Sequence, residues 1–136
     1  MRHMLGIAAL FAVLAAGDAA AAPMTKDEYK AGRMKIAEDY QAARKRCGAH
    51  VGNNTDICVA QARAAQKIAT AELDAAYKPS PRAYHKAALA RADADYSVAK
   101  QKCDAEPGDA KSACVKAATE ARESARVEAK AAAQAR

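Results

Sequence analysis

The sequence is poor in the side chains from which protein cores are usually built. It has no tryptophan, and its single phenylalanine, Phe11, lies in an apolar run near the N-terminus. Alanine supplies most of the remaining apolar content, and the larger aliphatic residues are scattered along the chain. Burial stabilises by about 25 cal/mol per Å² of apolar surface, so an alanine methyl adds little. The composition therefore excludes a thick core and predicts long helices in close contact, held by some further constraint.

Familiar catalytic and metal-binding motifs are also missing. The chain after residue 21 contains no G-x-S-x-G, no H-E-x-x-H and no glycine-rich phosphate loop. Its cysteines do not form closely spaced C-x2-C pairs, which argues against a zinc site and against a thiol redox catalyst. His50 and His85 have no partner pattern, and we expect both to be solvated. The sequence predicts no enzyme activity, no catalytic residues, no metal and no cofactor.

The N-terminal segment, residues 1–21, has the pattern of a secretory signal peptide. The uncharged run from Met4 to Ala16 is shorter than the roughly 20 residues that a membrane-spanning helix needs. Small residues follow, and we place the cleavage site after Ala21. An uncleaved membrane anchor is the alternative. With cleavage, the sequence predicts a periplasmic protein without a transmembrane segment, and no cysteine follows the run to carry a lipid anchor.

The first helical hairpin is predicted over residues 22–78. Thr25 and Glu28 have the spacing of a capping box, which marks the start of the first helix. Gly48 is predicted to end that helix in a left-handed conformation, and Thr55 or Asp56 to cap the next. One face of the first helix is defined by residues at alternating steps of three and four: Tyr29, Arg33, Ile36, Tyr40, Ala43 and Cys47.

The second hairpin is predicted over residues 82–136, after the break at Pro79-Ser80-Pro81. Ser80 is a good helix cap, and a proline is favoured at the first helical position. The third helix then repeats the register of the first and reaches Cys103. The last helix is predicted to begin near Asp109 and to continue almost to the end of the chain. The fold class is therefore all-α, with four helices in two helix–loop–helix hairpins.

An internal repeat relates the two hairpins. The segments Tyr40–Val59 and Tyr96–Val115 each have a tyrosine seven residues before a cysteine and ten residues between their two cysteines. Equivalent positions are 56 residues apart, which indicates a duplication. The repeat does not decide whether the hairpins fold onto each other as a four-helix bundle or stay extended.

The four cysteines are predicted to form structural disulfides. An even number of cysteines at regular spacing in an exported protein is typical of a disulfide framework. Four cysteines allow three pairings. The repeat favours Cys47–Cys58 and Cys103–Cys114, because each pair would then join the end of one helix to the start of its neighbour. Closing a loop of about 12 residues stabilises by about 3 kcal/mol in the chain-entropy model.

The tyrosines and charges each allow two interpretations. Tyr29, Tyr40, Tyr84 and Tyr96 fall on predicted inner faces, which favours a packing role over a ligand-stacking platform. Basic residues gather in the last turns of the first and third helices, where cations complement the helix dipole. A functional alternative is that these helix ends contact an anionic envelope polymer or a lipid head group. The residues concerned are Arg44, Lys45, Arg46, Lys100 and Lys102. Nucleic acid is not an expected partner.

The second copy of the repeat carries a family resemblance. Asp93–Cys103 reads DADYSVAKQKC, and Cys114–Ala117 reads CVKA. This resembles small exported Ala/Lys-rich proteins of proteobacteria that carry one or two copies of a D-A-D-Y-x-V-A-K-x-K-C…C-V-K-x-A pattern. Residues 35–59 match more loosely. Such proteins are sometimes compared with TolA, a likeness that lies mainly in Ala/Lys/Glu composition. The resemblance implies an exported helical protein, but it assigns no activity and no role to any residue.

The sequence as a whole predicts a non-enzymatic protein of the periplasm or cell envelope. It would act through its helix surfaces as an interaction, structural or stress-related module, with envelope proteins or anionic envelope polymers as partners. One alternative is a chaperone-like module with an apolar cradle between the hairpins. Another is a cationic module that binds peptidoglycan or lipid.

Overall fold

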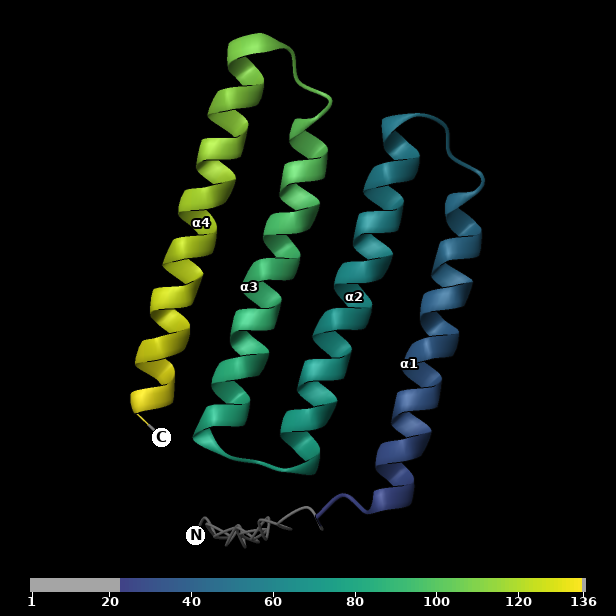
Figure 1. Ribbon diagram of the computed structural model, residues 1–136, viewed down its shortest axis with the longest axis vertical. Helices are drawn as coiled ribbons and strands as arrows, with labels where there is room; N and C mark the ends of the chain where they lie inside the picture. Colours follow the sequence, from purple (N-terminus) through teal and green to yellow (C-terminus); the bar gives the residue numbers. More distant parts are fainter. Residues whose placement is uncertain (1–22, 136) are drawn as a thin grey trace, which may run out of the picture.

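The computed structural model describes residues 23–135, and these form four α-helices (Figure 1). The helices are α1 (Lys26–Cys47), α2 (Asn53–Tyr77), α3 (Pro81–Cys103) and α4 (Gly108–Gln134). No β-strand occurs within the described range. The prediction of an all-α fold made of two hairpins is confirmed. The predicted signal peptide, residues 1–21, lies outside the described residues.

The four helices lie side by side in one layer (Figure 1). Contacts join α1 to α2, α2 to α3 and α3 to α4, and no other pair of helices within residues 23–135 is in contact. The chain runs up and down through the layer in sequence order. The hairpins therefore neither fold onto each other as a bundle nor stay apart. They pack edge to edge, and this leaves both broad faces of the layer open to solvent.

The helix starts predicted from capping residues are confirmed. The Thr25 hydroxyl accepts a hydrogen bond from the Glu28 amide at 3.2 Å, and the Glu28 carboxylate accepts one from the Thr25 amide at 2.7 Å. The bond from that amide is the main reason that the pKa of Glu28 lies below its ordinary value. Ser80 caps α3 by accepting a bond from the Ala83 amide at 3.1 Å, and Pro81 occupies the first helical position.

The turn between α1 and α2 differs from the prediction. Gly48 follows the last residue of α1, but its φ of −65° is right-handed. Successive turn bonds, including one from the His50 amide to the Cys47 carbonyl, continue the right-handed path past the helix end. The left-handed conformation occurs instead at Gly52, with φ of 57°, where the chain turns into α2. The helix thus starts at Asn53, and neither Thr55 nor Asp56 caps it.

Both predicted disulfides are present. Cys47 bonds to Cys58 and Cys103 bonds to Cys114, with Cα–Cα distances of 5.5 and 5.6 Å. Each disulfide joins two neighbouring helices at the loop end of a hairpin. Cys47 and Cys103 are also the largest side chains that are fully buried among the described residues. The disulfides therefore take the place of bulky apolar side chains as well as closing the loops.

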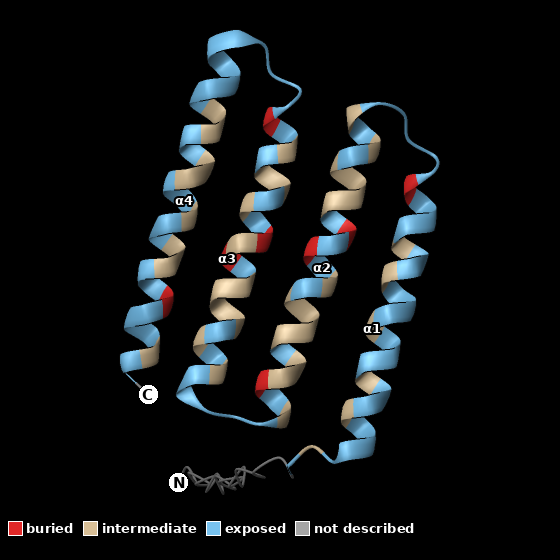
Figure 2. Cartoon of the chain, viewed as in Figure 1, coloured by how far each residue is buried: buried red, intermediate tan, exposed pale blue. Residues whose placement is uncertain are grey.

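Small residues make up the rest of the buried interior. Figure 2 shows the buried positions as short patches where neighbouring helices touch, with no continuous central core. Ala94 and Ala75 are 1% and 2% exposed. Such small side chains let helix backbones approach closely, so close contacts between helices hold the layer together in place of a thick hydrophobic core. The buried set within residues 23–135 is Cys47, Ala62, Ala64, Ala75, Ala92, Ala94, Cys103 and Ala129.

The seam between α2 and α3 has no counterpart at the outer edges of the layer. Ala64 of α2 and Ala94 of α3 are buried in this seam. The positions 56 residues away on the outer helices are Glu120 of α4 and Glu38 of α1, and both are exposed. A glutamate that packed against a further helix would lose its hydration. The outer edges are thus suited to end the layer, as polar terminal repeats do in helical repeat proteins.

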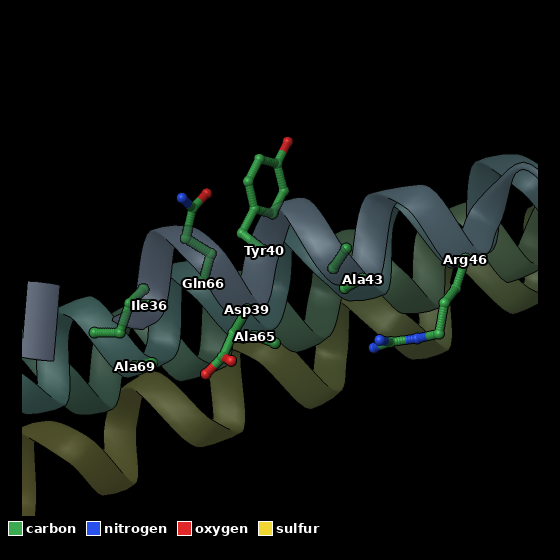
Figure 3. Close-up of a pocket in the computed structure, with 9 residues that line it drawn as sticks. Ile36, Asp39, Tyr40, Ala43, Arg46, Ala65, Gln66 and Ala69 are labelled. Atoms are coloured by element: carbon green, nitrogen blue, oxygen red, sulfur yellow. The ribbon is translucent and has the colours of Figure 1, made fainter. Parts of the chain in front are cut away.

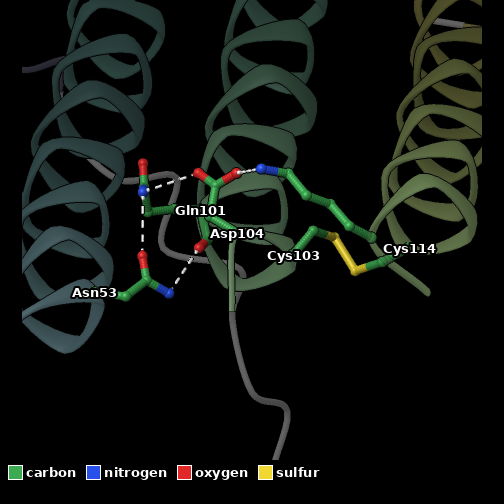
Figure 4. A network of polar contacts seen from close by, with 6 residues as sticks. Asn53, Gln101, Cys103, Asp104 and Cys114 are labelled. Carbon is green, nitrogen blue, oxygen red and sulfur yellow. Dashed lines mark hydrogen bonds and ion pairs between the residues drawn. A yellow bond between two sulfur atoms is a disulfide. The ribbon is translucent and has the colours of Figure 1, made fainter. Parts of the chain in front are cut away.

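Polar contacts reinforce the same seam. Arg91 of α3 forms an ion pair with Glu72 of α2. Near the hairpin loops, the Asn53 amide donates to the Gln101 carbonyl at 3.3 Å (Figure 4). The Gln101 side chain in turn donates to the carboxylate of Asp104, which pairs with Lys111 of α4 at 2.8 Å. This network links α2, α3 and α4 at one end of the layer.

Candidate functional site

Three shallow grooves adjoin one another on one broad face of the layer. They lie between α1 and α2, between α2 and α3, and between α3 and α4, with volumes of about 240, 470 and 200 Å³. Ala65 lines both the first and the middle groove, whereas Asp95 and Ala99 line both the middle and the last. The three grooves therefore form one trough across the layer. We call this side the alanine face, after the residues that line most of it.

The first and last of these grooves are equivalent under the 56-residue offset. Asp39 and Tyr40 line the first groove, and Asp95 and Tyr96 line the last. Figure 3 shows Asp39 pointing to one side of the first groove and Tyr40 to the other. The two hairpins thus present the same acid–tyrosine pair against a background of alanine.

The two grooves differ at two equivalent positions. Ile36 in the first groove corresponds to Ala92 in the last. Gln66 in the first groove corresponds to Arg122 in the last, and the Arg122 guanidinium carbon lies 4.2 Å from the centre of the Tyr96 ring. The Nε atom of Arg122 is buried and has no hydrogen-bond partner among residues 23–135. The cation–π contact offsets part of the cost of burying this cation. The Arg122 side chain therefore occupies part of the last groove, and the first groove has the shorter Gln66 at the equivalent position.

The opposite broad face is lined by bases. A groove of about 240 Å³ between α2 and α3 is bordered by Arg63 and Lys67, together with Ser97. Ala64 lines both this groove and the middle groove of the alanine face, so the two grooves open on opposite sides of the same seam. A further groove of about 310 Å³ between α3 and α4 is bordered by Arg126 and Lys130.

Contacts between helices place these grooves on one common face. Ser97, in the first basic groove, donates from its hydroxyl to the carbonyl of Asp93, and Arg126, in the second, lies 3.7 Å from the Asp93 carboxylate. At the other outer helix of the layer, Arg33 of α1 lies 3.7 Å from Asp74 of α2. Asp74 is seven residues from Lys67 and shares its side of α2. All four helices therefore contribute to the same basic surface.

Helical spacing extends this surface along each helix, since residues three, four or seven apart share a side. We call the result the basic face. Its bases are Lys30, Arg33 and Arg44 of α1, Arg63, Lys67 and Lys78 of α2, Arg82, Lys86 and Lys100 of α3, and Arg126 and Lys130 of α4. Its acids are Asp27, Asp56, Asp74, Asp93 and Glu123. Eleven bases thus face five acids.

Among the described residues, all acids of the basic face except Asp56 form ion pairs with its bases, whereas many of the bases form none. Asp27 pairs with Lys30, and Asp74 pairs with Arg33. Both Asp93 and Glu123 pair with Arg126. Within residues 23–135, no carboxylate lies within ion-pair distance of the exposed bases at the centre and ends of the face. These are Arg63, Lys67, Lys78, Arg82, Lys86, Lys100 and Lys130. Their charge is therefore directed to solvent or to a partner.

The alanine face carries balanced charge by comparison. Lys35 contacts both oxygens of Asp39 at 3.0 Å, and Glu72 pairs with Arg91. The layer is thus strongly polarised from one broad face to the other.

The five bases predicted at the helix ends do not form one patch. Arg44 lies on the basic face and donates to the Tyr40 hydroxyl at 3.3 Å. Lys100 lies on the same face, while Arg46 and Lys102 line grooves of the alanine face. Lys45 is exposed on α1. The two loop ends also differ, because the segment that follows Lys102 in the second hairpin contains three acids. These acids are Asp104, Glu106 and Asp109.

Tyr29 and Tyr40 have opposite electrostatic surroundings. Tyr29 donates its hydroxyl to the Asp74 carboxylate at 2.7 Å and stacks on Tyr77 with ring centres 4.4 Å apart. That bond to a carboxylate raises the pKa of Tyr29. The Tyr40 hydroxyl accepts from Arg44 and also interacts with Arg63, and both guanidinium groups lower the pKa of Tyr40. The Tyr40 hydroxyl thereby joins two bases of the basic face across neighbouring helices.

Two predictions about aromatic side chains need correction. Tyr84 of α3 is 39% exposed and therefore does not occupy an inner position. His85 is half-buried rather than solvated, with its Nδ1 atom 3.1 Å from the carbonyl of Ala129 on α4. Tyr29, Tyr40 and Tyr96 are half-buried, as expected for tyrosines that pack.

No family model, no curated protein and no solved structure matches the chain. The resemblance to exported Ala/Lys-rich proteins therefore stays a prediction. Among residues 23–135, no group of three or more His, Cys, Asp or Glu side chains is placed to hold a metal ion. Over the same range, no helix has both the length and the apolar character needed to cross a membrane.

The basic face was missed because no local motif encodes it. Its bases are spread over four helices, and the sequence shows only single bases at steps of three, four and seven. On each helix alone, these bases are typical of an ordinary solvent-exposed side. Only the single-layer arrangement brings the four basic stripes to one side.

Proposed function

We propose that this protein is a non-enzymatic interaction module of the cell envelope that attaches to anionic material through its basic face. The observation that carries the proposal is the excess of bases on this face, eleven against five acids. The face is flat and open, and seven of its bases have no ion pair among the described residues. Anionic envelope polymers and anionic lipids are the partners that suit it.

The physical basis is the summed field of many bases on one side of a thin layer. Each exposed charge interacts weakly with a single counterion in water, but clustered charges of one sign create a potential that concentrates an anionic partner. The interaction range is about 10 Å at 0.1 M salt, which is comparable to the spacing of neighbouring helices. The bases of adjacent helices therefore act together on a partner that lies against the face.

The disulfides support the proposed location. Disulfides persist in oxidising compartments such as the bacterial periplasm and are rare in the cytosol. Here each hairpin contains one disulfide, with one of its two cysteines buried, and both disulfides require an oxidising compartment. Together with the signal-peptide pattern of residues 1–21, this favours export, where anionic envelope components are the accessible polyanions.

A matched pair of variants tests the proposal. Arg44→Glu/Lys100→Glu changes two bases of the basic face, and Arg46→Glu/Lys102→Glu changes two bases that line the alanine face. Both variants alter the last turns of α1 and α3 and change the net charge equally, so the effect of the helix dipole is similar. The variants differ in the side of the layer that they change, and Arg44→Glu also removes the hydrogen bond to the Tyr40 hydroxyl.

The measurement is the salt concentration that elutes each protein from an immobilised sulfated polysaccharide. We expect the basic-face variant to elute at markedly lower salt than the wild type, and the alanine-face variant to stay close to it. Equal losses in the two variants would show that net charge or the helix ends, and not the face, determine binding. Retention of the wild type that does not weaken with salt would also contradict the proposal.

A second candidate function is a chaperone-like role for the alanine face. Ile36 and Ile68, both half-buried, line its grooves together with Val98, so apolar surface is accessible there. The measurement is suppression of aggregation of an unfolding client protein, with Ile68→Ser compared with Lys67→Ser. This role predicts protection that Ile68→Ser weakens and Lys67→Ser leaves intact, and no protection by the wild type would exclude it.

A further inference from the structure

We infer that the anionic partner of the basic face is the surface of a lipid bilayer containing anionic head groups, with the helices lying parallel to the membrane plane. This inference rests on the proposed function and adds to it the class of partner and the orientation of the protein. The alanine face is then directed away from the membrane.

The two-dimensional spread of the bases favours a surface over a linear polymer. Neighbouring packed helices are about 8–10 Å apart, so four in a layer spread their bases over roughly 30 Å across the helix axes. The helices contain 22 to 27 residues, which corresponds to about 33–40 Å along the axes. A single polymer chain can follow only one or two of these helices at a time. A planar array of phosphates can meet all four stripes at once.

Exposed bases occur on every helix of the face, including the two central ones. Lys67 of α2 and Lys86 of α3 have no ion pair among residues 23–135, and the same is true of Lys130 on the outer helix α4. Lysine side chains place a charged head at the end of a long apolar stem, which suits the boundary between water and lipid head groups. Each base near an anionic membrane strengthens binding by roughly fivefold.

An exposed methionine at the border of the same face also suits a membrane surface. Met34 is 66% exposed, and it lies one turn from Lys30 and one turn from Glu38, where the basic face meets the outer edge of the layer. A flexible apolar side chain next to bases can enter the head-group region while the lysine ammonium stays at the phosphates. A soluble polyanion would leave this side chain in water.

The experiment is flotation of the full, oxidised protein with vesicles of phosphatidylcholine, with and without phosphatidylglycerol. We expect the protein to float only with vesicles that contain phosphatidylglycerol and to dissociate as salt is raised. Lys67→Glu/Lys86→Glu should lower the partition constant at least about 25-fold, given roughly fivefold per base. The matched variant Arg46→Glu/Lys102→Glu should change it by much less. Met34→Ser should weaken binding to vesicles and leave elution from sulfated polysaccharide unchanged.

Circular dichroism and thiol titration of each variant verify that the helices and disulfides are intact, and a variant that fails is replaced by Lys86→Gln/Lys130→Gln. Binding to sulfated polysaccharide without binding to anionic vesicles would overturn the bilayer inference and leave the proposed function standing. Failure to bind either material would overturn both. Vesicle binding that the alanine-face variant weakens as much as the basic-face variant would overturn the orientation and with it the inference.

Discussion

At the scale of single residues, the structure depends on small side chains in contact positions. Ala94 is 1% exposed and lies in the seam between α2 and α3. The sequence contains few large apolar residues, so these alanines form the buried helix contacts that leucine or phenylalanine forms in ordinary cores. Their small size is what allows the helices to lie close together.

We therefore expect Ala94→Leu to destabilise the protein by about 1–3 kcal/mol, as overpacking of a close contact does. The control is Ala37→Leu, at an exposed position of α1, which should change stability by less than about 0.5 kcal/mol. Urea unfolding of the oxidised proteins measures both. A stabilising effect of Ala94→Leu would show that the seam is looser than the structure has it.

Two tyrosines should titrate in a defined order. The carboxylate of Asp74 raises the pKa of Tyr29, and the guanidinium groups of Arg44 and Arg63 lower the pKa of Tyr40. Tyr40 should therefore ionise at a pH below the ordinary tyrosine pKa of about 10, and Tyr29 at a pH above it. The bond from Tyr29 to Asp74 contributes stability that is present below that value and is lost as pH rises through the raised pKa.

Ultraviolet difference titration measures this order, with Tyr29→Phe and Tyr40→Phe as matched variants. Tyr29→Phe should remove the component that ionises at highest pH, and Tyr40→Phe the component that ionises earliest. The interpretation of both contacts fails if the two variants remove the same component.

At the scale of elements, the local chemistry of the helices could be read from the sequence, and their lateral arrangement could not. The capping groups Thr25 and Ser80 act within one turn of the chain, so their roles were predictable. The pairing of Cys47 with Cys58 followed from a short loop of the repeat. The conformation of Gly48 could not be predicted, because the conformation of a turn depends on where the next helix begins. The single-layer arrangement could not be predicted either, since alanine contacts can form on any side of a helix.

The disulfides should be the strongest single stabilising elements. Replacing Cys103 and Cys114 together by serine removes a loop constraint worth about 3 kcal/mol and also leaves a polar group at a buried position. The equivalent pair, Cys47 and Cys58, should cost a similar amount because the loop lengths are equal. Urea unfolding of both double variants measures this. A loss well below 1 kcal/mol in both would mean that the helix contacts alone hold the hairpins.

The outer edges of the layer should resist association because of their glutamates. Glu38 and Glu120 occupy positions whose equivalents in the central seam are Ala94 and Ala64. Glu38→Ala/Glu120→Ala makes both edges resemble that seam and should promote edge-to-edge oligomers. Sedimentation velocity measures the oligomeric state, and Asp39→Ala/Asp95→Ala on the alanine face is the control. If the edge variant stays in the same state as the wild type, the glutamates do not limit the layer.

At the scale of the whole molecule, a single layer gives the chain two large faces at the expense of a thick interior. One face collects eleven bases and the other collects alanines with balanced charge. A four-helix bundle of the same helices would bury one side of each and leave no flat basic surface. The polarity of the layer is thus a property of the arrangement, and this is why no single stretch of the sequence revealed it.

Lysine reactivity in the presence of an anionic partner tests the basic face most directly. The wild-type protein is acetylated at low reagent concentration with and without vesicles containing phosphatidylglycerol, and each lysine is quantified by mass spectrometry. We expect protection of Lys30, Lys67, Lys78, Lys86, Lys100 and Lys130, with Lys35 and Lys102 remaining reactive. Uniform protection of all lysines, or protection confined to Lys45, Lys100 and Lys102 at the helix ends, would contradict it.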